Sequence, residues 1–173
     1  MKTEGIRASR VVAAFDDPTA AWEDGAVAWA GGRIVYVGPA AGAPPADYTE
    51  YRGAVVTPGL VDAHTHAAWV GSRHDEFVRK MRGDDYRDIA AAGGGIKASA
   101  RAIAAASEDE IAATLAARLR RMAALGVTTV EVKSGYGLEP DEERKQLAAI
   151  ANEVDSTLGL QKLGALEALG QRL

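Results

Sequence analysis

The sequence changes character at Thr57-Pro58-Gly59-Leu60-Val61-Asp62-Ala63-His64-Thr65-His66. The Pro-Gly pair interrupts regular structure, and the run from Leu60 to His66 has the length and the apolar start of a β-strand. Because side chains alternate along a strand, His64 and His66 are predicted to lie on one face. Neutral imidazole is a good ligand for Zn²⁺ and Fe²⁺. Spacing alone, however, does not distinguish a metal-binding pair from two polar residues at a strand end.

Upstream of this stretch, short strands and turns predominate. Residues 26–37 are predicted to form two strands around Gly31-Gly32, because glycine allows the positive φ angles of a two-residue hairpin. Residues 38–47, which contain three prolines, are expected to form a loop, and residues 54–57 a further strand. We therefore place a domain boundary after residue 57, so that residues 1–57 form a small, partial, β-sandwich-like domain.

Downstream, helices and strands alternate. A polar loop is expected to precede a short helix over residues 84–92, which the glycines at 93–95 end. The clearest helix is predicted over residues 107–125, with a Ser107/Glu110 capping box and then apolar residues at helical spacing. Those residues are Ile111, Leu115, Leu119 and Met122.

The β-branched residues 127–132 predict a second strand after that helix. Pro140 suits a first helical turn, and the helix that it begins is expected to reach about residue 154. Residues 157–163 are expected to begin a third strand. The order of strand, helix and strand predicts parallel βαβ units.

Composition excludes several classes of function. The net charge is −4 with no dominant cluster of lysine and arginine, so neither nucleic acid nor an anionic membrane is an expected partner. No apolar run approaches the ~18 residues of a membrane span. The absence of cysteine removes disulfides and thiolate chemistry and is typical of a cytoplasmic protein. At 173 residues the chain is shorter than the ~250 of a complete eight-stranded α/β barrel.

Four segments, in order, resemble the imidazolonepropionases of the amidohydrolase superfamily. The first is the 57–66 stretch after a small β piece, in which the superfamily carries a metal-binding His-x-His pair. The others are Gly71-Ser72-Arg73, Ala91-Ala92-Gly93-Gly94-Gly95-Ile96 and Gly126-Val127-Thr128-Thr129-Val130-Glu131-Val132-Lys133-Ser134-Gly135-Tyr136-Gly137-Leu138. The last is the most specific, and the likeness covers roughly residues 20 to 150.

The resemblance implies an α/β fold, in which a small N-terminal β piece precedes the first βα units of a TIM-type barrel over residues 58–173, with the barrel incomplete. It also implies metal-dependent hydrolysis of the cyclic amide of 4-imidazolone-5-propanoate, a small-molecule substrate, to N-formimidoyl-L-glutamate. His64 and His66 would bind one divalent metal ion, Zn²⁺ or Fe²⁺/Fe³⁺, and Arg73 and Tyr136 would contact the substrate. An arginine offers a bidentate fork to the carboxylate of this substrate.

Alternatives to this function are another cyclic amidohydrolase or deaminase of the superfamily, or a non-catalytic fragment. Among the other polar residues, Asp62 is expected to have a structural role and His74 to be a loop residue. Glu131 and Lys133 are expected either to point into the barrel or to pair with each other. The triple glycine lacks the strand-to-helix setting of a dinucleotide-binding loop.

Part of the family's site has no counterpart in this sequence. The resemblance calls for a third histidine and a late aspartate, but no histidine follows His74. Where the family carries Leu-Gly-Ala-His, this chain has Leu163-Gly164-Ala165-Leu166, and the likeness fades from about Asn152. We therefore predict no catalytic residue beyond the metal ligands and expect a partial form that is inactive alone. Its open sheet would need a homo-oligomer, a complementing chain or the missing residues to cover it.

Overall fold

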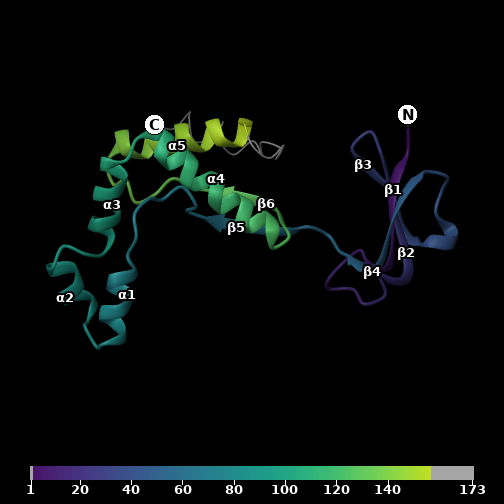
Figure 1. Cartoon of the computed structure of the whole chain (residues 1–173), viewed down its shortest axis with the longest axis horizontal. Helices are drawn as coiled ribbons and strands as arrows, with labels where there is room; N and C mark the ends of the chain where they lie inside the picture. Colours follow the sequence, from purple (N-terminus) through teal and green to yellow (C-terminus); the bar gives the residue numbers. More distant parts are fainter. Residues whose placement is uncertain (1, 157–173) are drawn as a thin grey trace. The chain divides into compact units, whose positions relative to one another are not determined.

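A computed structural model describes residues 2–156, which fall into two compact units divided after Gly59 (Figure 1). The strand expected over residues 157–163 and the Leu163–Leu166 segment lie outside the described residues. Each unit is described separately below.

The first unit is a four-stranded sheet in the order β3-β2-β1-β4. Its strands are β1 Glu4–Val12, β2 Ala21–Ala30, β3 Arg33–Pro39 and β4 Asp47–Val56. β2 pairs antiparallel with both β1 and β3, and β4 pairs parallel with β1. The predicted hairpin is confirmed, with φ angles of 58° and 75° at Gly31 and Gly32.

Three features of the first unit were not expected from the sequence. The loop predicted over residues 38–47 contains the 3-10 turn η1 Ala40–Gly42, and β4 begins earlier than residue 54. β1 was not predicted at all. Its register shifts between Ala8 and Arg10, so the buried positions do not follow a strict alternation that a pattern search would find.

The second unit contains two strands and five helices within its described residues. The strands are β5 Leu60–Thr65 and β6 Val127–Val132. The helices are α1 His74–Met81, α2 Tyr86–Ala91, α3 Ile96–Ala105, α4 Glu108–Ala124 and α5 Pro140–Ser156. β5 and β6 pair in parallel, which confirms the predicted βαβ connection, and the predicted capping box begins α4.

The predicted polar loop is wrong, because the segment between β5 and α2 contains α1. His74 is the first residue of this helix and not a loop residue. Charged side chains at its two ends stabilise the helix by interacting favourably with its dipole: Asp75 and Glu76 in the first turn, Arg79 and Lys80 in the last. The helix has no buried residue: its apolar side chains share one face, but that face is exposed and covers only about one turn, which is too short to indicate a helix in a sequence.

Two further differences from the prediction concern β5 and α3. β5 ends at Thr65, so His66 lies immediately after the strand. α3 was not predicted, since only Ile103 of its ten residues is buried. The remainder of α3 is rich in alanine, which forms helices well but makes no recognisable stripe.

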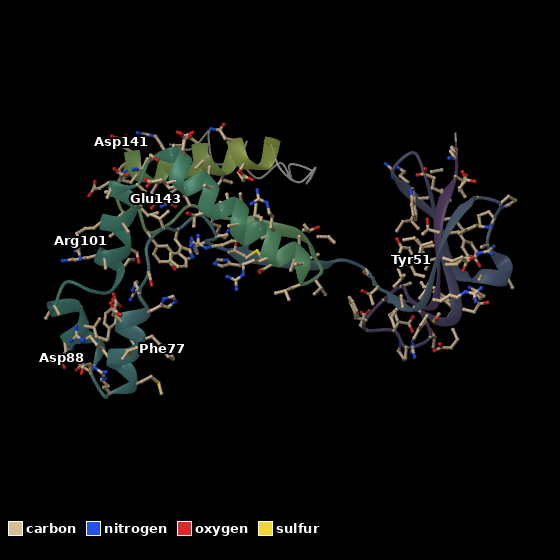
Figure 2. The ribbon with its side chains drawn as sticks, in the orientation of Figure 1. Tyr51, Phe77, Asp88, Arg101, Asp141 and Glu143 are labelled. Atoms are coloured by element: carbon tan, nitrogen blue, oxygen red, sulfur yellow. The ribbon has the colours of Figure 1, made fainter. Side chains whose placement is uncertain are left out.

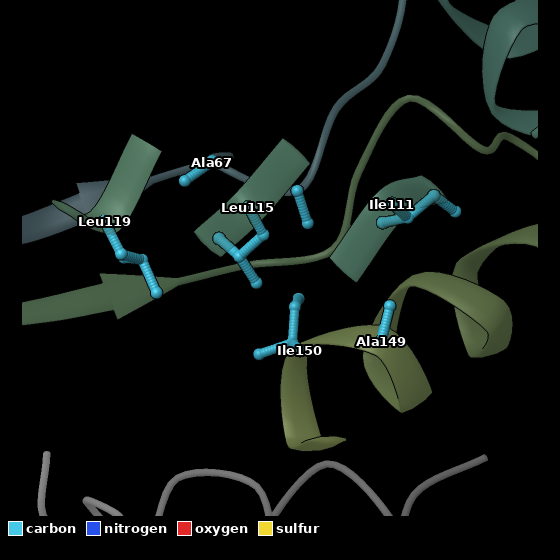
Figure 3. Close-up of a cluster of buried hydrophobic side chains, with 7 residues drawn as sticks. Ala67, Ile111, Leu115, Leu119, Ala149 and Ile150 are labelled. Atoms are coloured by element: carbon cyan, nitrogen blue, oxygen red, sulfur yellow. The ribbon is translucent and has the colours of Figure 1, made fainter. Parts of the chain in front are cut away.

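The core of the second unit lies between α4, α5 and the segment that follows β5 (Figure 3). From α4, the core contains Ile111, Leu115 and Leu119 of the predicted stripe, with Met122 at its margin. Ala149 and Ile150 come from α5, and Ala67 and Ala68 come from the chain just after the histidine pair. The core therefore anchors the chain at the exit of β5. Among residues 2–156, no helix combines the length and apolar composition needed to cross a membrane.

Candidate functional site

The two histidines of the 57–66 stretch lie side by side. The ring centroids of His64 and His66 are 5.5 Å apart, with the ring planes at 74°. His64 is exposed, whereas His66 is half-buried and its Nδ1 is buried with no hydrogen-bond partner. The pair therefore combines one ring open to solvent with one ring held inside the unit.

This geometry fits two ligands of one metal ion. With metal–nitrogen distances of ~2.0–2.1 Å and a tetrahedral angle, two imidazole centroids lie roughly 5 Å apart. The observed 5.5 Å is close to that value. Among the described residues, however, no group of three or more His, Cys, Asp or Glu side chains is placed to hold a metal. The part of the chain described here offers two ligands, and their metal binding stays a prediction.

Residues 133–139, the β6 loop, pack against His66. The Tyr136 ring centroid lies 5.2 Å from that of His66. A Cβ atom at Gly135 would come within 2.5 Å of His66 Nδ1, so only glycine fits there. Tyr136 has a φ of 71°, a left-handed conformation that a side-chain-bearing residue rarely adopts. The loop thus carries a strained tyrosine at the histidine pair, which is typical of functional sites.

Side chains at the start of α5 hold this loop. The Gln146 side chain, 1% exposed, accepts a hydrogen bond from the Gly135 N–H at 2.9 Å. Glu143, labelled in Figure 2, accepts from Gly137 N at 2.8 Å and Leu138 N at 3.0 Å. The helix that follows this glycine-rich turn therefore supplies side-chain acceptors for backbone N–H groups that have no partner within the turn.

A pocket of about 530 Å³ brings together three of the four predicted site residues: His66, Arg73 and Tyr136. The remaining lining residues are Thr65, Ala67, Trp69, Glu76, Phe77, Lys80, Ser99, Arg118 and Met122. The fourth predicted residue, His64, does not line the pocket but stands beside His66. Three basic side chains against one carboxylate make the pocket suited to an anionic ligand.

Arg73 is paired within the pocket. Glu76 Oε2 accepts hydrogen bonds from Arg73 Nε at 2.9 Å and Nη2 at 2.5 Å. This hydrogen bonding to Glu76 raises the pKa of the Arg73 guanidinium, and the same interaction lowers the pKa of the Glu76 carboxyl, with the Gly95 N–H adding to the effect. Both groups therefore carry their charges throughout the physiological range.

Residues 66–73, the β5 loop, are held by Arg118 of α4. Its Nη1 donates to the carbonyl oxygen of Ala67 at 2.6 Å and also to that of Trp69, and the guanidinium lies 3.8 Å from the Trp69 ring centroid. Burial lowers the pKa of this arginine. Arg118 thus ties the chain between His66 and Arg73 to α4, one of the two helices of the core.

One alternative that the sequence left open concerns Glu131 and Lys133. Lys133 Nζ lies 2.6 Å from Glu131 Oε1, so these residues pair with each other. The Asp62 carboxylate is 3.5 Å from the His64 N–H, at the limit of a hydrogen bond, and it contributes to no group of metal ligands among the described residues.

Four residues around the site were not predicted from the sequence: Glu76, Arg118, Glu143 and Gln146. A signal existed for Arg118, which lies three residues after Leu115 and four before Met122, on the apolar stripe of its helix. Gln146 likewise lies three and four residues before Ala149 and Ile150, on the buried face of α5. A polar residue on an apolar stripe indicates a buried hydrogen bond. Glu76 gave no such signal, because no residue of α1 is buried.

Comparison with curated proteins agrees with this site. The chain is 45% identical over 130 residues to an imidazolonepropionase of Mesorhizobium japonicum, which covers 73% of this chain and 32% of that protein. It is 48% identical over 118 residues to one of Pseudomonas fluorescens, covering 66% of this chain and 29% of that protein. This chain is a homologue of the imidazolonepropionases. It spans about a third of the length of these curated imidazolonepropionases. A search of family models finds none that matches the chain.

Among solved structures, those of a triazine hydrolase share the mixed α/β fold of this chain. A triazine hydrolase variant aligns with 93% of this chain and 34% of its own, with a TM-score of 0.63 and 20% identity. A second variant of that hydrolase covers 88% of this chain and 34% of its own, with a TM-score of 0.51 and 20% identity. At such identities the likeness concerns the fold alone.

Proposed function

We propose that this chain carries the first part of a metal-dependent amidohydrolase site. In the whole protein, that site would hydrolyse the cyclic amide of 4-imidazolone-5-propanoate to N-formimidoyl-L-glutamate. The observation that carries the proposal is the single pocket that joins His66, Arg73 and Tyr136, with His64 beside it. The imidazolonepropionase homology supports the same substrate.

Each site residue has a proposed role that its chemistry supports. His64 and His66 hold one divalent ion, Zn²⁺ or Fe²⁺/Fe³⁺, at the exit of β5. When bound, such an ion polarises a carbonyl group and lowers the pKa of a bound water towards ~7. Arg73 donates hydrogen bonds from its free N–H groups to the propionate of the substrate, and Tyr136 contacts the substrate ring from the β6 loop.

The charge of the pocket favours this substrate over uncharged cyclic amides. Arg73, Lys80 and Arg118 are set against the one carboxylate of Glu76 among the lining residues. A ligand with a carboxylate gains a charge-assisted contact there, whereas a neutral ring does not. This difference separates the proposal from the alternative of a deaminase or other cyclic amidohydrolase for uncharged rings.

A second candidate is a non-catalytic role for the 173-residue chain on its own. The observation in its favour is that the described residues supply two potential metal ligands, one fewer than a usual catalytic zinc site. We expect the purified chain, with added zinc or iron, to show no hydrolysis of 4-imidazolone-5-propanoate above background. Steady turnover that disappears on His64→Ala would contradict this expectation.

Metal binding by the same chain tests the histidine assignment directly. We expect one weak site for Zn²⁺ or for Co²⁺ as a spectroscopic probe, since two imidazoles alone bind loosely. His64→Ala and His66→Ala should each weaken binding by at least roughly tenfold, because the loss of one of two ligands removes half of the coordination by protein. His74→Ala is the matched control, since the third histidine pairs with Ser72 and stands outside the pocket. Equal weakening by all three variants would overturn the assignment.

A further inference from the structure

Glu76, which pairs with Arg73, has a role of its own. Glu76 lies one helical turn after Arg73, and its side chain is 14% exposed against 38% for that of Arg73. One carboxylate oxygen, Oε2, accepts both hydrogen bonds from the guanidinium. Two of the five N–H groups of the arginine are thereby engaged. The three that remain are available to a ligand.

The other oxygen of Glu76 is attached to a different element. Oε1 accepts a hydrogen bond from the Gly95 N–H at 2.9 Å, and Gly95 is the N-cap residue of α3. A negative charge at a helix N-terminus is favourable. Glu76 therefore joins Arg73 to the start of α3.

The triple glycine makes this contact possible. A Cβ atom at Gly94 would come within 2.9 Å of Glu76 Oε1 and 2.7 Å of an Ile89 methyl group. Gly93 and Gly95 have φ angles of 84° and 70°, which favour glycine. The three glycines, which do not form a phosphate-binding loop, thus have a physical explanation. They let a carboxylate approach the backbone closely.

We propose that Glu76 is a positioning residue, which holds the Arg73 guanidinium with its free N–H groups directed to the ligand carboxylate in the pocket. This inference deepens the proposed function and rests on it for the identity of the ligand. A long arginine side chain that is free at the end of a loop loses rotamer entropy when it binds, and prior fixation by Glu76 removes part of that cost. Glu76 would in this way set the preference of the site for carboxylate-bearing rings.

An opposite role is also conceivable on electrostatic grounds, since Glu76 is itself a carboxylate and could compete for Arg73. The two roles predict opposite effects. If Glu76 competes, its removal strengthens binding of an anionic ligand, and if it positions, its removal weakens that binding.

The experiment compares the full chain with Glu76→Gln by nuclear magnetic resonance. Glutamine has a similar shape but presents an amide that cannot accept at both ends. The matched control is Asp84→Asn, which disrupts another arginine–carboxylate pair outside the pocket, from Arg79 Nε of α1 to Asp84 Oδ2 just after that helix at 2.6 Å. The probes are 3-(imidazol-4-yl)propanoate and 4-ethylimidazole, which share a ring but differ in the carboxylate.

Two readouts distinguish the positioning role of Glu76 from the carboxylate site of the proposed function. In the ligand-free chain, the Nε–H proton of Arg73, whose signal is assigned by its loss in Arg73→Lys, should exchange slowly with water. Of the two variants, only Glu76→Gln should make that exchange fast. In titrations, the original chain should bind the propanoate roughly tenfold more tightly than ethylimidazole, and Glu76→Gln should remove most of that preference. Asp84→Asn should change neither readout.

A slow Nε–H signal that persists in Glu76→Gln, or a stronger preference for the propanoate in that variant, would overturn the positioning role. If the original chain does not distinguish the two probes although Glu76→Gln abolishes the slow signal, the carboxylate site of the proposed function is wrong. Glu76 would then still be shown to order Arg73.

Discussion

The β5 loop and the β6 loop supply residues to one pocket but are held in opposite ways. In the β5 loop, carbonyl oxygens accept hydrogen bonds from a cationic side chain, Arg118 of α4. In the β6 loop, backbone N–H groups donate to side-chain oxygens of Gln146 and Glu143 of α5. Each loop is therefore fixed by one of the two helices that pack against each other in the core.

The backbone of the two loops explains the difference. The β5 loop places Ala67 and Ala68 in the core, so burial of apolar surface contributes to its order. The β6 loop contributes no residue to that core and has left-handed φ angles at Tyr136 and Leu138. Each such angle costs of the order of 1 kcal/mol or more, so this loop depends on its hydrogen bonds and on the absence of a side chain at Gly135. The β6 loop should accordingly be the less tolerant of substitution.

The largest effect is expected from Gly135→Ala. The new methyl group would meet His66 Nδ1 at 2.5 Å and Cε1 at 2.7 Å, at a φ of 155°. We expect a loss of about 2–4 kcal/mol in the free energy of unfolding and a shift of the His66 imidazole resonances. Urea denaturation and the imidazole spectrum measure the two effects. Gly83→Ala is the matched control, because Gly83 also has a positive φ but has no atom within 4 Å of an added Cβ. A comparable loss in both variants would mean that contact with His66 is unimportant.

An intermediate effect is expected from Arg118→Ala in the β5 loop. The change removes two hydrogen bonds to carbonyl oxygens and the stacking on Trp69. Because the burial of Ala67 and Ala68 remains, the loss should be limited to about 1–3 kcal/mol of unfolding free energy. The Trp69 indole N–H resonance should shift. Arg120→Ala, an exposed neighbour on α4, should change neither quantity, and a larger loss than in Gly135→Ala would reverse the ranking of the two loops.

The smallest effect is expected from Tyr136→Phe. The variant keeps the ring beside His66 and the left-handed backbone, and within residues 2–153 the hydroxyl shows no hydrogen-bond partner. Stability should therefore change by less than ~0.5 kcal/mol. Binding of 3-(imidazol-4-yl)propanoate should weaken by about 0.5–1.5 kcal/mol if the hydroxyl contacts the ligand. Titration of both forms decides this point, and a large drop in stability with unchanged binding would assign the hydroxyl a structural role.

Local sequence patterns were sufficient for several parts of this protein. The capping box and stripe of α4, the β-branched run of β6 and the glycine hairpin of the first unit depend on interactions within a few residues, so their patterns predict them. The same holds for His64 and His66, which are two positions apart in the chain and whose rings lie together. For Arg73 and Tyr136, the sequence indicated candidates through the family resemblance and not through spacing.

The contacts that assemble the pocket could not be read from local patterns, because they join residues far apart in the chain. Arg118 reaches a loop 49 to 51 positions earlier, and Glu76 reaches a glycine 19 positions later. Whether such polar groups meet depends on how α4, α5 and the β5–β6 pair pack, which is a property of the whole unit. α1 also escaped detection, since its apolar face is exposed and covers only about one helical turn. The sequence thus indicated most of the elements and the metal-ligand candidates, but not β1, α1 or α3. Packing brought Tyr136 to the pocket of Arg73 and Glu76, because that separation in sequence is bridged only in three dimensions.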